Sequence, residues 1–121
     1  MSTTAAILDG RTIESVQLAD TTVHVERLAP RLVAFVVRAG EVHKLLFNKP
    51  LVITSGNDHD HVAGSRHYLN AAVDLRAHDL GPAQQELFLL ALVSIGQDEK
   101  VAVFDERVNP DKQHWHCEVS G

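Results

Sequence analysis

Apolar residues recur with the period of an α-helix in two stretches of the chain. In residues 30–46 they return every three or four positions, and Pro30 lies in the first turn, where its missing N–H does no harm. Asn48 and the residues after it end this pattern. The second stretch begins at Pro82 and ends near Gly96. The sequence therefore predicts two helices.

Short runs of apolar and β-branched residues predict four buried strands, at residues 51–54, 71–75, 101–104 and 115–119. From residue 30 onward, the elements then follow the order helix, strand, loop, strand, helix, strand, strand. That order indicates an α+β domain with a small, mostly antiparallel sheet and helices packed on one side.

The first 28 residues carry a weaker pattern. Residues 1–5 are typical of a frayed start. Residues 13–16 and 21–25 favour β-structure, and the second run alternates, so that it is either a short strand or an extended arm. We therefore expect an N-terminal arm, residues 1–28, followed by a core of residues 30–119.

The size, charge and cysteine content of the chain narrow the classes of protein to which it can belong. The chain has 121 residues, which predicts a single domain able to bury a core. The only cysteine, Cys117, allows neither an intrachain disulfide nor a cysteine-rich zinc site. A formal net charge of -5 argues against nucleic-acid binding through a broad basic surface. We see no secretory signal and no membrane-spanning run, so we expect a protein made in the cytoplasm without a membrane partner.

One candidate metal-binding segment is residues 65–74, which read SRHYLNAAVD. It offers the imidazole of His67 and the carboxylate of Asp74, both of which are zinc ligands in proteins. The alternative is that His67 is a surface histidine and Asp74 a charge at a strand end. An aspartate inside an apolar strand is disfavoured without a partner. These residues by themselves support the two interpretations about equally.

A second candidate segment is His114-Trp115-His116 in the last predicted strand. In a strand the two histidines project from one face and Trp115 from the other. They can share a metal, or one can bind it while the other transfers protons. Cys117 should point away from His116 into the core. Glu118 falls on the His116 face, where its carboxylate can orient a ligand.

The two segments resemble the zinc D,D-peptidase family (peptidase family M15), whose signature is Ser-x-His-x-x-Gly-x-Ala-x-Asp. The chain matches it at Ser65, His67, Ala72 and Asp74, and has Asn70 where the family usually has glycine. Before it, VITSG at 52–56 is similar to the family's strand and Thr-Ser-Gly turn. The resemblance covers roughly residues 30–118 and implies a fold of the Hedgehog and D,D-peptidase type.

The resemblance also implies roles for individual residues. It implies a zinc ion held by His67, Asp74 and His116. Family members with a Glu-x-x-His form use that glutamate as general base, whereas this chain has Gln113, which cannot take a proton at neutral pH. His114 is therefore the candidate base or acid, with a solvated histidine as the alternative.

A second departure concerns the arginine that the family usually has shortly after the Ser-Gly turn. Asp58 stands at that place, and Arg66 is the candidate substitute for binding substrate. Nearby, His59 and His61 alternate with carboxylates. They form either a second metal site or a hydrated loop at the mouth of the cleft.

By this resemblance, we expect a zinc metallopeptidase that hydrolyses peptidoglycan stem peptides or a related D-amino-acid peptide. It would be a D,D-carboxypeptidase or an L-alanyl-D-glutamate endopeptidase. A short chain without an export signal favours a phage-type lytic enzyme released at lysis, or one domain of a larger assembly. The competing hypothesis is a catalytically weak or inactive metal-binding structural domain, which Gln113 and Asp58 support. The sequence indicates neither the bond that is cut nor the oligomeric state.

Overall fold

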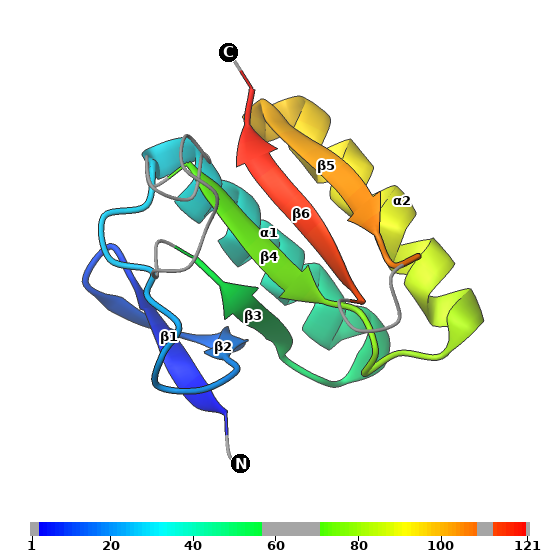
Figure 1. The fold of residues 1–121 in the computed structure, drawn as a ribbon, viewed down its shortest axis with the longest axis horizontal. Coiled ribbons are helices and arrows are strands. Elements are labelled where there is room, and N and C mark those ends of the chain that lie inside the picture. Colours follow the sequence, from blue (N-terminus) through cyan, green and yellow to red (C-terminus); the bar gives the residue numbers. More distant parts are fainter. Residues whose placement is uncertain (1–2, 57–70, 109–112, 121) are drawn as a thin grey trace.

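The computed structural model describes residues 3–56, 71–108 and 113–120, and these contain one sheet and two long helices (Figure 1). The two helices and four strands predicted from residue 30 onward are present, and they occur in the predicted order. Most of the loop predicted between the first two of these strands lies outside the described residues. The elements are β1 (Thr4–Leu8), β2 (Arg11–Leu18), α1 (Pro30–Phe47), β3 (Leu51–Ser55), β4 (Ala72–Arg76), α2 (Pro82–Glu99), β5 (Val101–Glu106) and β6 (His114–Val119).

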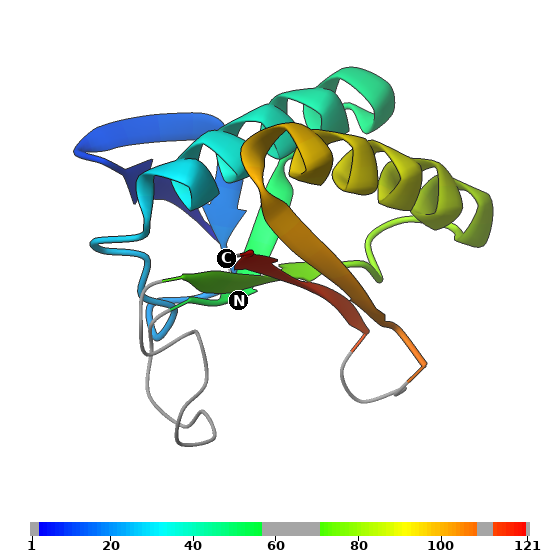
Figure 2. The same ribbon diagram turned by 90° about the horizontal axis from the view of Figure 1, so that it is seen from above.

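The strands of this sheet follow the order β1-β2-β3-β4-β6-β5. β2 and β3 run parallel, and the other neighbouring strands are antiparallel. The sheet is therefore mixed, and the prediction of a mostly antiparallel sheet is wrong. A parallel pair needs a crossover connection, and α1 provides it between β2 and β3. Figure 2 shows both helices on the same face of the sheet, so the α+β class is confirmed.

The N-terminal segment belongs to the sheet, contrary to the expected arm. β1 and β2 form a hairpin whose turn is Asp9-Gly10, with φ angles of 52° and 76°. Two positive φ angles are what the tight turn of a two-residue hairpin requires, and Asp-Gly favours it. Residues 21–25 form no strand, although Val23 and Val25 are buried in the core. Their alternation thus reflects burial of an irregular segment.

Helix α1 lies close against the N-terminal hairpin because of a glycine in its middle. A Cβ added at Gly40 would lie 2.5 Å from Cγ2 of Val16 in β2. The glycine therefore allows a close approach of helix and sheet, which outweighs its poor helix propensity. The helix ends at Phe47, and the next residue, Asn48, has a left-handed conformation and donates its backbone N–H to the carbonyl of Lys44.

The core lies between the two helices and the sheet face that they cover. Trp115 is fully buried there, and its ring centroid is 5.5 Å from that of Phe88 in α2. Cys117 is also fully buried, as predicted, and burial raises the pKa of its thiol. Burying a large apolar side chain stabilises a fold by roughly 1.5–3 kcal/mol.

Neither described helix has the length and apolar character needed to cross a membrane.

A histidine also takes part in this core. His43 of α1 is only 2% exposed, and its Nδ1 lies 2.7 Å from the backbone carbonyl oxygen of Lys49. Its ring contacts those of Phe47 and Phe88 edge to face, with centroids 5.2 and 4.9 Å away. Because water is excluded from this position, burial lowers the pKa of His43 below its ordinary value.

Candidate functional site

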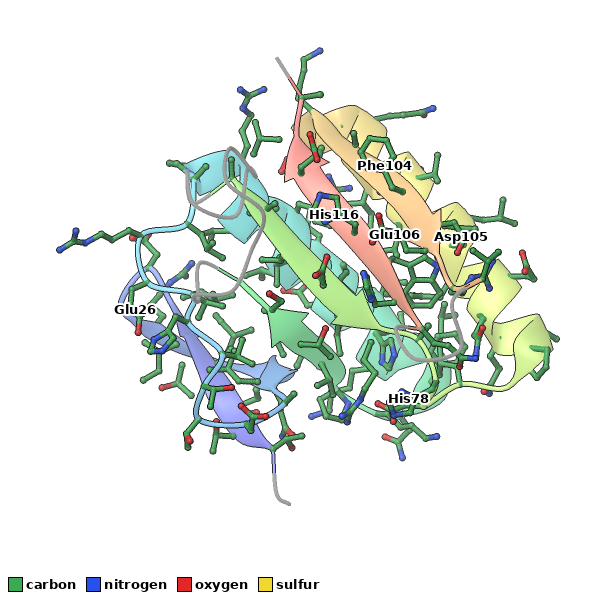
Figure 3. All side chains as sticks on the ribbon, viewed as in Figure 1. Glu26, His78, Phe104, Asp105, Glu106 and His116 are labelled. Carbon is green, nitrogen blue, oxygen red and sulfur yellow. The ribbon has the colours of Figure 1, made fainter. Side chains whose placement is uncertain are left out.

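The candidate site lies on the face of β4, β6 and β5 that points away from both helices, which we call the open face (Figure 2). Strand register places its side chains in rows across the three strands. One row joins Asp74, His116 and Phe104, and the next joins Arg76, His114 and Glu106. Figure 3 shows the positions of Phe104, Glu106 and His116 on β5 and β6. The prediction that His114 and His116 share a face opposite Trp115 is confirmed.

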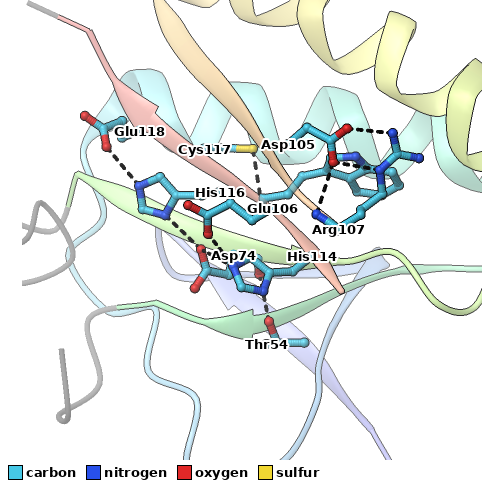
Figure 4. Close-up of polar contacts among 10 residues, drawn as sticks. Thr54, Asp74, Asp105, Glu106, Arg107, His114, His116, Cys117 and Glu118 are labelled. Carbon is cyan, nitrogen blue, oxygen red and sulfur yellow. Dashed lines mark hydrogen bonds and ion pairs between the residues drawn. The ribbon is translucent and has the colours of Figure 1, made fainter. Parts of the chain in front are cut away.

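Asp74 and His116 form the centre of this face. Their Oδ1 and Nδ1 atoms lie 2.9 Å apart although the residues are 42 positions apart in sequence (Figure 4). The Nε2 atom of the same ring lies 2.8 Å from Oε1 of Glu118, which confirms that the two residues share a face of the strand. Thr54 of β3 donates its hydroxyl to the backbone carbonyl of Asp74 at 3.4 Å. The pairing of β4 with its neighbours β3 and β6 thus fixes the positions of Asp74 and His116.

The two carboxylates change the protonation of His116. Its hydrogen bond to Asp74 has the largest effect and raises the pKa of His116 to about 9, with Glu118 adding to the rise and burial opposing it. In the absence of a metal, the ring is therefore an imidazolium at neutral pH. It then donates one N–H to each carboxylate.

His114 forms a second pair on the same face. Its Nε2 lies 2.7 Å from Oε1 of Glu106 and 3.7 Å from Oδ1 of Asp74. One ligand-capable atom from each of these three residues lies within 4.8 Å of the others, so the group could hold a metal ion. Carboxylate oxygens with an imidazole nitrogen suit zinc and several other divalent ions. A possible metal site at Asp74 is thus present, with partners that differ from the predicted ligands.

The remaining predicted residues fall into two groups. Gln113 precedes β6, and its backbone carbonyl accepts a hydrogen bond from the N–H of Ala77 at 3.2 Å. Its side chain is exposed. The rest lie outside the described residues, namely Asp58, His59, His61, Ser65, Arg66, His67 and Asn70.

Glu106 is the site residue that our sequence analysis did not identify. We expected the strand to end at Phe104, whereas β5 continues to Glu106. This extension places the carboxylate directly opposite His114 on the neighbouring strand. The sequence did offer one signal, the two-residue period of a strand, which places residues 102, 104 and 106 on the same face.

The neighbouring acid, Asp105, has a different environment. Its carboxylate accepts hydrogen bonds from Nε and Nη2 of Arg107 at 2.7 and 2.6 Å (Figure 4). This guanidinium holds the pKa of Asp105 below its usual range. Arg107 also contacts Glu86 of α2 at 3.0 Å and lies 5.6 Å from the ring centroid of Trp115. Asp105 is therefore part of a structural cluster that joins β5 to α2.

Comparison of the chain with known protein families and with curated proteins found no match. Its function must therefore be inferred from the chemistry of the open face and from the motifs in the sequence.

Proposed function

We propose that this protein is a zinc-dependent metallopeptidase that hydrolyses peptidoglycan stem peptides or a related D-amino-acid peptide. The observation that carries the proposal is the contact between Asp74 and His116 at 2.9 Å. The motif resemblance assigns these residues, with His67, to one zinc ion. Two ligands so distant in sequence must converge if they share a metal, and they do so here. The substrate class and release at lysis are proposed from the resemblance alone.

The residues around Asp74 fit a zinc ion in chemistry and in spacing. Ligand atoms at about 2.0–2.2 Å from a tetrahedral zinc lie about 3.3–3.6 Å from one another. Asp74 Oδ1 and His116 Nδ1 are 2.9 Å apart in their hydrogen bond, so a small separation of the two side chains would let them share the ion. His116 must lose a proton to bind through Nδ1. Glu118 can then accept the remaining N–H from Nε2, which fixes the orientation of the ring.

A bound zinc ion would lower the pKa of its water to about 7 and polarise the substrate carbonyl. The other residues bind substrate and move protons. His114 lies beside Asp74 and takes part in proton transfer together with the carboxylate that it contacts. Arg66 is proposed to bind the substrate's carboxylate, because an arginine matches that group with two parallel hydrogen bonds.

The test combines metal analysis with product identification. Purified protein should contain about one zinc ion per chain and should release peptides from purified peptidoglycan, as identified by mass spectrometry. Asp74→Ala and His116→Ala should lose both zinc and cleavage. His114→Ala should keep zinc and lose cleavage. Glu41→Gln, an exposed change on α1, is the control and should keep both.

The outcomes distinguish the possible errors. Zinc lost from His114→Ala but kept by His116→Ala would move the ligand role to Asp74, Glu106 and His114. Zinc without cleavage of any cell-wall peptide would favour a second function, an inactive metal-binding structural domain. The amide at Gln113 is the observation that favours this alternative. Absence of zinc would exclude both functions.

A further inference from the structure

We propose that Glu106 is the carboxylate that accepts the proton of the attacking water at this site. This inference rests on the proposed function, because it assigns a residue to the same hydrolysis. The family resemblance implies a carboxylate base at position 113, where this chain has Gln113, an amide that cannot act as a base. The structure places Gln113 just before β6 and puts a different acid next to His114.

The position of Glu106 follows from strand pairing. Glu106 is the cross-strand partner of His114, and its Oε1 lies 2.7 Å from Nε2 of that ring. A ligand-capable oxygen of Glu106 also lies within 4.8 Å of one on Asp74. A water molecule beside Asp74 is therefore within hydrogen-bonding reach of the Glu106 carboxylate. The side chain is 50% exposed, so substrate can approach it.

The other described acids near the site have different contacts. Asp74 and Glu118 hold the two nitrogens of His116. Asp105 is held by Arg107 in the cluster beside Trp115. Glu106 is the acid that combines contact with His114, exposure and closeness to Asp74. In Figure 4 the contacts of Asp105 and Glu106 are separate, although the two residues are neighbours in sequence.

The proton follows a closed path in this reaction. The Glu106 carboxylate takes a proton from the water as the oxygen of that water bonds to the peptide carbonyl carbon. Glu106 then gives the proton to the leaving nitrogen as the carbon–nitrogen bond breaks, and it returns to the carboxylate form. His114 donates its Nε2–H to Oε1 and holds the carboxylate in position. One water molecule is consumed for each bond cut.

The test uses the zinc-loaded protein and a set of synthetic stem peptides. Glu106→Gln should lower kcat by roughly 10²–10⁴-fold with KM unchanged. Its zinc affinity, titrated with zinc alone, should equal that of the wild type. Added formate should restore part of the kcat of Glu106→Ala, because a small carboxylate can enter the space left by the side chain. Glu41→Gln should match the wild type in every measurement.

Three results would overturn the inference. If Glu106→Gln cleaves as fast as the wild type, Glu106 is not the base, while the proposed function stands. If Glu106→Gln loses zinc, Glu106 is a metal ligand instead. If zinc-loaded wild type cleaves no peptide, the proposed function fails and this inference fails with it. Retained zinc, a lowered kcat and rescue by formate together would support it.

Discussion

The two faces of β4 and β6 differ completely in chemistry, although consecutive residues of the same strands build them. One face points to the helices and is apolar and fully buried, with Val73, Leu75, Trp115 and Cys117. The open face carries Asp74, His114, His116 and Glu118. Since neighbouring residues in a strand project to opposite sides, stability and chemistry are separated by a single step along the chain.

This arrangement also makes the two faces dependent on each other. A shift of the β6 register by one residue would exchange every side chain between the faces. The packing of Trp115 against Phe88 opposes such a shift, because it would expose the indole and bury charged groups. Packing on the helix-covered face of the sheet, which we call the covered face, therefore stabilises the strand register that brings Asp74 and His116 into contact.

The strongest test of this comparison removes the largest side chain of the covered face. Trp115→Ala should lower the free energy of unfolding by about 3–5 kcal/mol, because it leaves a cavity beside Phe88. Urea denaturation followed by circular dichroism measures the change.

Phe104→Ala is the matched control, since it also removes an aromatic ring but from the open face. Phe104 is 48% exposed, and its ring centroid is 5.9 Å from that of His116. Its removal should cost less than about 1 kcal/mol. A loss as large as that of Trp115→Ala would mean that the open face is a second core, and the comparison would fail.

A substitution on the open face should have an effect of intermediate size, and the quantity that it changes should be the affinity for zinc. Glu118→Gln keeps the shape of the side chain but removes the charge that faces Nε2 of His116. Zinc affinity should fall by roughly 10–100-fold, the usual effect of losing a group that orients a ligand. Unchanged zinc affinity would contradict a ligand role for His116.

The smallest expected effect concerns the protonation of His43, which is buried on the helix side of the sheet. Burial lowers the pKa of His43, with the charge of Lys49 acting in the same direction and the Lys49 carbonyl and Asp79 opposing it. The unfolded chain therefore binds more protons below the ordinary value of 6.5, and stability should fall as the pH decreases. The slope from one group is at most about 1.4 kcal/mol per pH unit.

The measurement compares urea denaturation of the wild type and of His43→Phe between neutral pH and about pH 5. Phenylalanine keeps the aromatic packing against Phe47 and Phe88 but cannot be protonated. The difference in stability between the two proteins should change with pH, because other titrating groups are common to both. A difference that is constant with pH would show that His43 does not titrate on unfolding.

Local patterns were sufficient to predict most of the fold. Helical periodicity identified α1 and α2, and β-branched runs identified the four strands from β3 onward. The short, alanine-containing β1 was missed, although the Asp9-Gly10 turn offered a hairpin signal. The parallel pairing of β2 with β3 could not be predicted, because it depends on contacts between residues distant in sequence.

Only part of the candidate site could be predicted and compared with the structure, because His67 and Arg66 lie outside the described residues. Alternation in 114–118 correctly separated His114 and His116 from Trp115 and Cys117. Asp74 was identified by its motif, and its contact with His116 required the pairing of β4 with β6. Glu106 carries no motif, and its closeness to His114 arises only when β5 and β6 align.

The position of β6 between β4 and β5 has a consequence for folding kinetics. The Glu106–His114 contact closes a segment of 8 positions, within a hairpin that is formed from local pairing. The Asp74–His116 contact closes 42 positions and requires that hairpin to dock on β4 across the length of α2. Since contacts between distant residues form more slowly, we expect the hairpin to form first. The site would then form in two stages. Ligand binding would measure the second stage, in which the hairpin docks on β4.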